Sequence, residues 1–302
     1  MPRKRFGKKQ SASTEIFTRQ SIDWKTEMKQ NKNTEKLLET LIEDSVQYKD
    51  IAIPSKETDK KHLIRSLMNV RMPREASDQL LDLQNDYLQE ELLKKGIVTL
   101  WEIPTIKEQY GSQFPNTDKI SLWQGDITRL KVDAVVNAAN SQMLGCFVPC
   151  HGCIDNAIHS AAGIQLRTEC NHIMNQRRIR YGEQYEEPTG TATLTKAYNL
   201  PCKYVIHTVG PIVYGKLNEE LRQELRNCYE NVLKCCVENE IKSVAFCCIS
   251  TGEFHFPNDE AAKIALNTVT DFLKMNDGME RVIFNVFKDS DKEIYQKIFG
   301  LN

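Results

Sequence analysis

A chain of 302 residues, 40% of them hydrophobic, is long enough for one large domain with an appendage or for two modest domains. Its formal net charge of -1 argues against nucleic-acid binding through a broadly basic face, because phosphate neutralisation needs such a face. No apolar run reaches the length of a signal peptide or a membrane span, which argues against a membrane partner and predicts an intracellular protein. The cytoplasm is favoured, and the basic start of the chain leaves the nucleus open.

The first third of the chain is predicted to be a tail followed by helices. Residues 1–33 open with a basic run that offers nothing to pack, which predicts a disordered tail. Over residues 34–96, leucines and isoleucines recur at spacings of three and four, which predicts helices that pack on the rest of the chain. The best-marked helix has Ser77 as its N-cap and ends at Gly96 after two lysines.

After Gly96 the pattern changes to short β-rich runs that alternate with helical ones. Strands are predicted at residues 119–124, 133–137, 191–196, 204–209, 243–249 and 281–286, and helices at 154–175, 218–238 and 259–275. This alternation predicts an α/β layer fold over residues 97–302, with a mostly parallel sheet between helices. Ligands of such sheets bind beyond the carboxyl ends of the strands.

Small polar loops follow three of these predicted strands, at residues 125–128, 137–140 and 250–254. In the last of them, Gly252 would let backbone amides approach a phosphate closely, and a helix N-terminus follows. Each loop alone is as well explained by an ordinary turn. Together they predict a cleft for a nucleotide-like ligand.

Cysteine and histidine crowd into the segment from Gly145 to His159. All ten cysteines of the chain lie at or after Cys146, and in a reducing compartment we expect them to be free or metal-bound. Cys146, His151 and Cys153 suit tetrahedral zinc, and three protein ligands leave a fourth position open, as catalytic zinc sites do. Cys150 is a competing thiol, and a closed structural zinc site is the alternative.

Five ordered motifs resemble the macrodomain family of ADP-ribose binders and hydrolases, over about residue 119 to the C-terminus. They are Gly125-Asp126-Ile127-Thr128, Val135-Val136-Asn137-Ala138-Ala139-Asn140, Ile154-Asp155-Asn156-Ala157-Ile158-His159, Tyr204-Val205-Ile206-His207-Thr208-Val209-Gly210-Pro211 and Ile249-Ser250-Thr251-Gly252. Where many members carry a glycine-rich loop, residues 145–153 hold the Cys and His residues. This replacement resembles the zinc-dependent macrodomains, which also carry extra N-terminal helices, and the run Arg65–Arg71 fits them. The resemblance implies a three-layer α/β/α macrodomain with an N-terminal helical extension.

The resemblance also implies an activity: zinc-dependent removal of mono-ADP-ribose from protein side chains, O-linked through an Asp or Glu ester or through Ser. The partners would be an ADP-ribosylated protein and ADP-ribose, and the cofactor one Zn²⁺ held by Cys146, His151 and Cys153, with Cys150 outside the ligand set. Asn140 would hydrogen-bond the distal ribose, and Asp155 would orient or activate a water. A simpler role for Asp155 is a carboxylate that stabilises a helix N-terminus.

The remaining site residues follow from the same resemblance. Asp126 would accept a hydrogen bond from the adenine amino group and the Ile127 amide would contact the ring. The diphosphate would bind the backbone of Ser250, Thr251, Gly252 and Glu253, and Phe254 would pack on the distal ribose. The Glu253 carboxylate must point away from the diphosphate or toward the metal, because like charges repel. His159 and His207 are predicted core residues, and the role of His255 stays open.

The main alternative is a reader module that binds ADP-ribose without cleaving it and holds a structural zinc. Asp126 and the loop 250–254 serve both functions equally, whereas the Cys and His residues with Asn140 and Asp155 favour a hydrolase. A dinucleotide oxidoreductase is disfavoured, because no G-x-G-x-x-G follows a predicted strand.

Overall fold

The computed structural model describes residues 33–301. The chain divides into two compact units, the first ending at Ile64 and the second running from Arg65 to the C-terminus. In the first unit, residues 33–44 are helical, and helix α2 (Glu57–Val70) begins there. The predicted tail at residues 1–33 lies outside the described residues apart from its last position, and the predicted domain boundaries stay predictions.

Helix α3 (Asp78–Lys95) has the predicted ends. The Ser77 side chain accepts a hydrogen bond from the Leu80 backbone N–H, and the Gly96 N–H donates to the carbonyls of Leu92 and Leu93. These bonds satisfy backbone groups that the first and last turns of a helix leave without partners. Gln84 of α3 accepts a 2.8 Å hydrogen bond from the Ile164 N–H, which attaches the helix to the α/β part of the second unit.

The second unit is built on a six-stranded sheet with the order β2-β8-β7-β4-β6-β5. The strands are β2 (Ile120–Gln124), β4 (Ala134–Ala139), β5 (Thr193–Lys196), β6 (Tyr204–Val209), β7 (Ser243–Phe246) and β8 (Arg281–Val286). Every neighbouring pair is parallel except β5 and β6. The predicted fold class, a mixed and mostly parallel α/β sheet, is confirmed. β4 is buried along nearly its whole length, as expected for a strand covered on both faces.

The helices of this unit differ from the prediction at one point. The sequence pattern predicts one helix over residues 154–175, but the chain forms α5 (Ile154–Ala162) and α6 (Ile164–Tyr181). Gly163, at φ 96° and ψ 174°, separates them, because this left-handed region is open to glycine and ends the helical hydrogen bonding. The other helices are α7 (Glu219–Glu238), α8 (Asn258–Met275) and α9 (Asp289–Ile298).

Several short elements were not predicted, and neither was α9. The short ones are β1 (Val98–Thr99), η1 (Leu100–Glu102), α4 (Ile106–Tyr110), η2 (Ile127–Arg129) and β3 (Leu130–Lys131). Each spans five residues or fewer, which is too short for a hydrophobic period to register. β1 and β3 pair in parallel as a separate two-stranded sheet.

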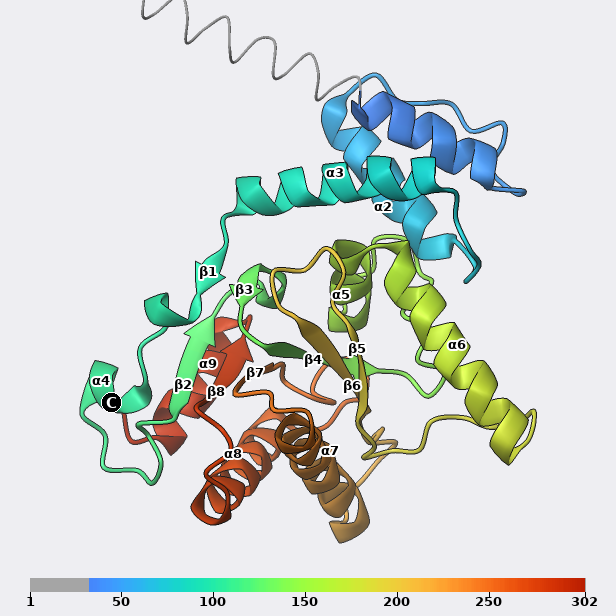
Figure 1. The fold of residues 1–302 in the computed structure, drawn as a ribbon. Coiled ribbons are helices and arrows are strands. Elements are labelled where there is room, and N and C mark those ends of the chain that lie inside the picture. The colour runs from blue at the N-terminus through green and yellow to red at the C-terminus, as the bar shows by residue number, and fades with distance from the viewer. Residues whose placement is uncertain (1–32, 302) are drawn as a thin grey trace, which may run out of the picture. The chain divides into compact units, whose positions relative to one another are not determined.

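The crossover connections between the strands indicate where on the sheet a ligand would bind. From β4 the chain passes through α5 and α6 toward β6 on one side, whereas α7 and α8 lead from β6 across β4 to β7 and β8. Right-handed crossovers in opposite directions put the two helix pairs on opposite faces, and Figure 1 shows them on different sides of the strands. The strand order therefore reverses at β4, where sheets of this kind bind ligands.

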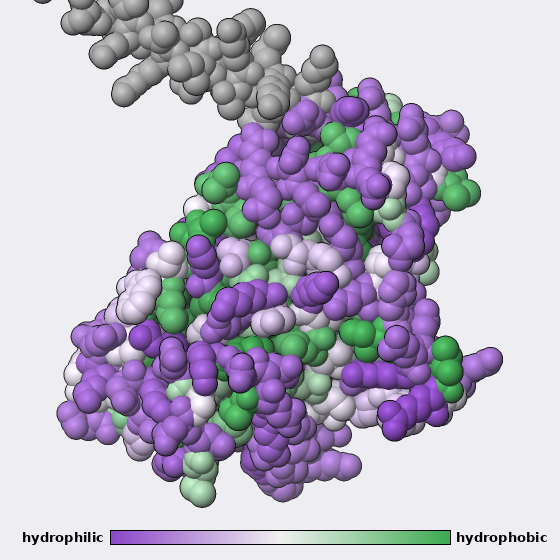
Figure 2. All heavy atoms as spheres, viewed as in Figure 1, coloured by the Kyte–Doolittle hydropathy of each residue, from purple (hydrophilic) through white to green (hydrophobic). Residues whose placement is uncertain are grey.

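The surface and the core divide as expected for a globular chain. Valine, isoleucine, alanine and phenylalanine of β4, β6, β7 and β8 fill the core together with the inner faces of α7 and α8. Figure 2 shows hydrophilic residues over most of the visible face, with hydrophobic residues in small groups between them. Among the helices of residues 33–301, none combines the length and the apolar character that crossing a membrane requires.

Candidate functional site

Two neighbouring strands end at the point where the strand order reverses. Asn140 directly follows β4, and the loop 250–254 follows β7, which pairs with β4. The Asn140 side-chain amide donates to Asp155 Oδ2 and to the Gly145 carbonyl, both at 3.3 Å. Asn140 thus joins the end of the strand to the segment that carries the cysteines.

Asp155 lies in the first turn of α5 and is buried. Its Oδ1 accepts a 2.8 Å hydrogen bond from Asn137 of β4, and its Oδ2 accepts the bond from Asn140. Burial raises the pKa of the Asp155 carboxyl to about 6, although the hydrogen bond from Asn137 acts in the opposite direction. The carboxylate is therefore fixed by two amides and still ionised in most molecules at neutral pH.

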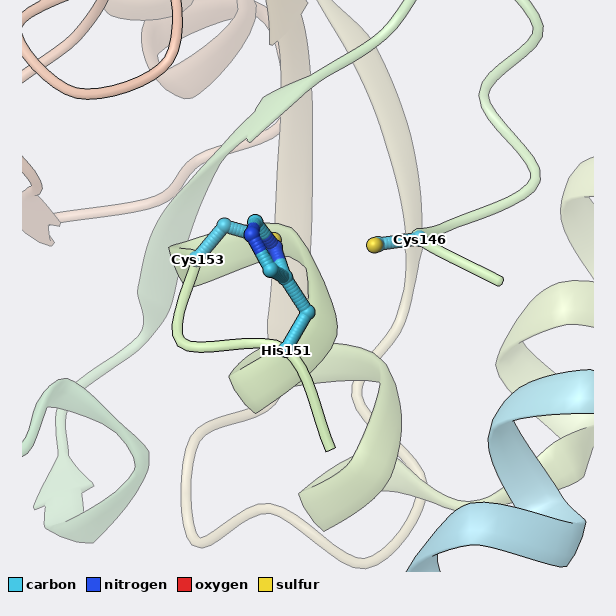
Figure 3. A group of neighbouring side chains, drawn as sticks. All are labelled: Cys146, His151 and Cys153. Carbon is cyan, nitrogen blue, oxygen red and sulfur yellow. The ribbon is translucent and has the colours of Figure 1, made fainter. Parts of the chain in front are cut away.

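The ligand loop, residues 145–153, brings the three predicted metal ligands together. One side-chain atom each of Cys146, His151 and Cys153 lies within 4.8 Å of the other two. Figure 3 shows the Cys146 sulfur directed toward the side chains of His151 and Cys153, which come from the turn at the start of α5. Cys150, in contrast, directs its sulfur to Ser66 Oγ at 3.3 Å.

These residues fit zinc. Two thiols and one imidazole form a common zinc donor set, and ligands of a tetrahedral site with Zn–S near 2.3 Å lie roughly 3.8 Å apart. His151 Nδ1 is buried and has no hydrogen-bond partner among the described residues, so a ring nitrogen is available to a metal. The Cys153 sulfur caps α5 by accepting from the Asn156 N–H at 3.4 Å. Burial raises the pKa of the Cys153 thiol to about 12, although this hydrogen bond acts in the opposite direction.

A second group of potential ligands, His159, Cys170 and His207, is buried in the core. His207 is already bonded at both ring nitrogens, to Asn137 at 3.1 Å and to Thr195 at 3.0 Å. The predicted core position of His207 is confirmed. His159 is equally buried, and its Nε2 lies 3.6 Å from Asp155 Oδ1.

We expect the buried neutral state of His207 to make the fold sensitive to acid. Burial lowers the pKa of His207 from 6.5 to about 3, so below pH 6.5 the unfolded chain binds a proton that the folded chain excludes. This contribution to stability is complete above pH 6.5 and is lost as the pH falls toward 3, by about 1.4 kcal/mol per pH unit. Urea unfolding of wild type and His207→Gln between pH 7 and pH 4 measures it.

The variant should show the weaker loss of stability on acidification. His172→Gln is the matched control, because the His172 side chain is 59% exposed. Protonation of Asp155, whose pKa is raised, stabilises the folded chain as the pH falls from 6 to 4. The quantity to compare is therefore the difference in the free energy of unfolding between wild type and each variant at the same pH. Equal slopes for wild type and His207→Gln would contradict the prediction.

The loop 250–254 has an open backbone. An added side chain at Gly252 would meet no atom within 4 Å, which leaves room for a ligand. Ser250 is buried with a φ of 64°, and the Phe254 carbonyl accepts from the Val213 N–H at 2.9 Å. Glu253 Oε1 lies 3.7 Å from His151 Nε2, so its carboxylate is turned toward the ligand loop. His255, whose role the sequence leaves open, is exposed.

Asp126 and Ile127 lie apart from this group, at the end of β2. Asp126 Oδ1 accepts from the Thr128 N–H and hydroxyl, and its Oδ2 lies 3.2 Å from Lys95 Nζ. The Asx turn that is the simple explanation of Asp126 is therefore present. Ile127 is buried in the first turn of η2.

Four supporting residues were not predicted to take part in the site. Asn137 was visible as a lone amide in an apolar run, and Arg65 as part of the run Arg65–Arg71, but neither pattern reveals a partner. Asn156 donates to the ligand-loop carbonyls of Cys146 and Val148, at 3.4 and 3.0 Å. Buried Arg167 bonds the Cys146 carbonyl of this loop, and nothing in the helical pattern distinguishes it from a surface arginine.

Known proteins resemble this chain over most of its length. A protein-ADP-ribose hydrolase of Treponema medium is 46% identical over 264 residues, which cover 87% of this chain and 97% of that protein. A protein-ADP-ribose hydrolase of Staphylococcus aureus strain MSSA476 is 41% identical over 277 residues, with coverage of 89% and 97%.

Family and structural comparisons agree with these relatives. The family model described as Macro domain matches residues 136–265. The crystal structure of a Trypanosoma brucei macrodomain in complex with ADP-ribose has a TM-score of 0.57 and 27% identity, covering 81% of this chain and 96% of that one. The match to the family model includes Asn140, the ligand loop, Asp155 and the loop 250–254 but not Asp126, and together with these relatives it shows that the chain belongs to the macrodomain family.

Proposed function

We propose that this protein is a zinc-dependent hydrolase that removes mono-ADP-ribose from O-linked positions on modified proteins. The order of the candidate residues along the edge of the sheet carries this proposal. Asp126 follows β2, the open loop 250–254 follows β7, and Asn140 with Asp155 lies at the end of β4. Adenine, diphosphate and distal ribose follow one another in the same order along ADP-ribose.

The spacing agrees with a ligand of this length. β2 and β4 are separated by β8 and β7 in the sheet, so three spacings of about 4.8 Å put their ends roughly 14 Å apart. A ligand bound by Asp126 at one end would reach Asn140 with its other end. The named activity of the two hydrolase relatives and the ADP-ribose bound by the Trypanosoma brucei macrodomain support this placement.

At the distal ribose the protein offers a carboxylate and an amide. Asn140 would donate to a ribose oxygen, and Asp155, held by Asn137 and Asn140, would accept a proton from the attacking water. The water oxygen would then bond the anomeric carbon as the bond to the side-chain oxygen breaks. An aspartate or glutamate oxygen would leave as a carboxylate and the proton on Asp155 would pass to solvent, whereas a serine oxygen would take up that proton. The products are free ADP-ribose and the unmodified side chain.

Cys146, His151 and Cys153 would hold one zinc ion beside the distal ribose. When bound, zinc supplies a Lewis acid at this end of the cleft. Glu253, 3.7 Å from His151 Nε2, would orient the imidazole, as carboxylates commonly do for metal-binding histidines.

Release of ADP-ribose from defined peptides tests the proposal. We expect the zinc-loaded protein to release ADP-ribose from an aspartate-ester peptide or a serine-linked peptide, and to leave an arginine-linked control peptide intact. Chromatography of the products follows each linkage separately, and calorimetry measures ADP-ribose binding. Tight ADP-ribose binding without release from any peptide would identify a reader module instead.

A further inference from the structure

We infer that Arg65 and Asn69 of α2, together with Asn156 and Arg167, form the structural support that shapes the ligand loop for its metal. This inference rests on the proposed zinc site. The support is defined here as Arg65, Asn69, Asn156 and Arg167, all of which lie in the second unit. These are positioning residues: their side chains bond the backbone of the loop or of its neighbours, and only the Asn156 backbone N–H reaches a ligand atom, the Cys153 sulfur.

Arg167 of α6 connects two segments through backbone oxygens. Its Nη1 donates to the carbonyls of Met68, Asn69 and Arg71 at the end of α2, at 3.1, 2.7 and 2.7 Å. Its Nε donates to the Leu144 carbonyl at 2.6 Å, and its Nη2 to the carbonyl of the ligand Cys146 at 3.4 Å. One buried guanidinium therefore fixes the entrance of the ligand loop relative to α2.

This arrangement explains why a charged group can be buried here. The last carbonyls of a helix lack intrahelical partners and form the negative end of its dipole, so they stabilise a cation. The Phe147 ring also lies 4.2 Å from the Arg167 guanidinium carbon. Removing the guanidinium would leave several buried carbonyls without donors at once, which is costly.

Arg65 holds the other half of the loop. Its Nη2 donates to the carbonyl of the ligand His151 at 3.2 Å and to Asn156 Oδ1 at 2.7 Å. The Asn156 side-chain amide in turn donates to the carbonyl of the ligand Cys146. Its backbone N–H, at the start of α5, donates to the sulfur of the ligand Cys153. All three ligands are thus bonded to the support through their own backbone or sulfur atoms.

Asn69 contacts the turn between the ligands. Its Oδ1 accepts from the Cys150 N–H at 2.9 Å, and its Nδ2 donates to Ser160 Oγ of α5 at 2.9 Å. Cys150 has a φ of 53°, a conformation that costs free energy in a non-glycine residue. The bond to Asn69 stabilises this backbone geometry, which turns the chain between Val148 and His151.

The test is zinc affinity, measured with zinc alone against a chromophoric chelator. We expect Arg65→Met and Arg167→Met to bind zinc at least about 10-fold more weakly than wild type, the effect typical of losing partners behind metal ligands. Arg167→Lys should recover part of the loss, since an ammonium group still reaches some of the carbonyls. In the cobalt-loaded proteins, the visible absorption bands should shift in both methionine variants because the ligand geometry changes.

Arg177→Met is the matched control. Arg177 lies on α6 as well, but it bonds Glu187 and Thr193 rather than the ligand loop. We expect it to lower the melting temperature and leave zinc affinity unchanged. If Arg167→Met does not fold, Arg65→Met decides the outcome.

The possible failures are distinguishable. Zinc affinity within twofold of wild type in both methionine variants would overturn the inference that these residues support the ligand loop, and it would leave the proposed zinc-dependent activity unaffected. An equal loss of affinity in Arg177→Met would overturn it too, because general destabilisation would then explain the effect. A wild-type protein that binds no stoichiometric zinc would overturn both this inference and the proposed function.

Discussion

Cys146→Ala is expected to lose stoichiometric zinc and to lower the rate of ADP-ribose release by at least about 100-fold, with ADP-ribose affinity nearly unchanged. Zinc content and turnover should fall without a loss of ADP-ribose affinity because the proposed zinc ligands and the proposed ADP-ribose-binding residues lie on different segments. Cys146 belongs to the ligand loop, whereas Asp126 and the loop 250–254 lie at the ends of other strands. Metal analysis, peptide turnover and calorimetry on the same preparation check the three expectations.

Cys150→Ser is the control for this prediction. It removes a thiol from the same loop, and serine can keep both the backbone bond to Asn69 and a side-chain bond to Ser66. We expect it to retain stoichiometric zinc and turnover. Loss of zinc from Cys150→Ser would make Cys150 a ligand and indicate a closed structural site, and full turnover of a zinc-stripped wild type would rule out a role for zinc in catalysis.

Asp155→Asn is expected to lower kcat by about 100- to 10,000-fold, the range for losing a general base, while zinc content and ADP-ribose affinity stay close to wild type. Asparagine has nearly the same shape, so the loss reflects the missing negative charge and proton acceptor rather than a cavity. One bond must rearrange, because Asn137 and Asn140 both donate to the carboxylate of Asp155. Single-turnover kinetics with an ester-linked peptide measure the effect.

Asp133→Asn is a matched control at the other end of β4. Asp133 is also a hydrogen-bonded carboxylate, accepting from the Ser243 N–H and hydroxyl and pairing with Lys203. We expect this variant to change stability and leave kcat unaltered. If Asp155→Asn kept wild-type kcat, Asp155 would serve only as a carboxylate at the N-terminus of α5, and the attacking water would need another base.

Much of the fold follows from periodicity that is local in the chain. The six strands of the large sheet lie where the β-rich runs predict them, and α7 and α8 match the predicted helices to within a residue at most ends. The predicted fifth strand was too long, since β7 ends at Phe246 rather than at residue 249. Hydrophobic spacing reports which faces are buried, but it does not report a backbone break such as the one at Gly163.

The candidate site was predictable to the extent that its residues are close in sequence. Cys146, His151 and Cys153 are separated by at most seven positions, and the donor types alone indicate a metal. Asp155 and Asn140 were predicted as site residues from their positions in the motifs that resemble the macrodomain family. The structure adds that these two side chains bond each other, at 3.3 Å.

The alternation of strands and helices and the donor set of the ligand loop can be derived from the sequence, because both depend on neighbouring residues. Which distant groups contact them follows from the packing of the folded chain. Arg167 bonds the Asn69 carbonyl across 98 positions, and Glu253 faces His151 from the loop of another strand. Such contacts depend on how the elements pack, since a polar side chain has the same local pattern whether its partner is water or a buried carbonyl.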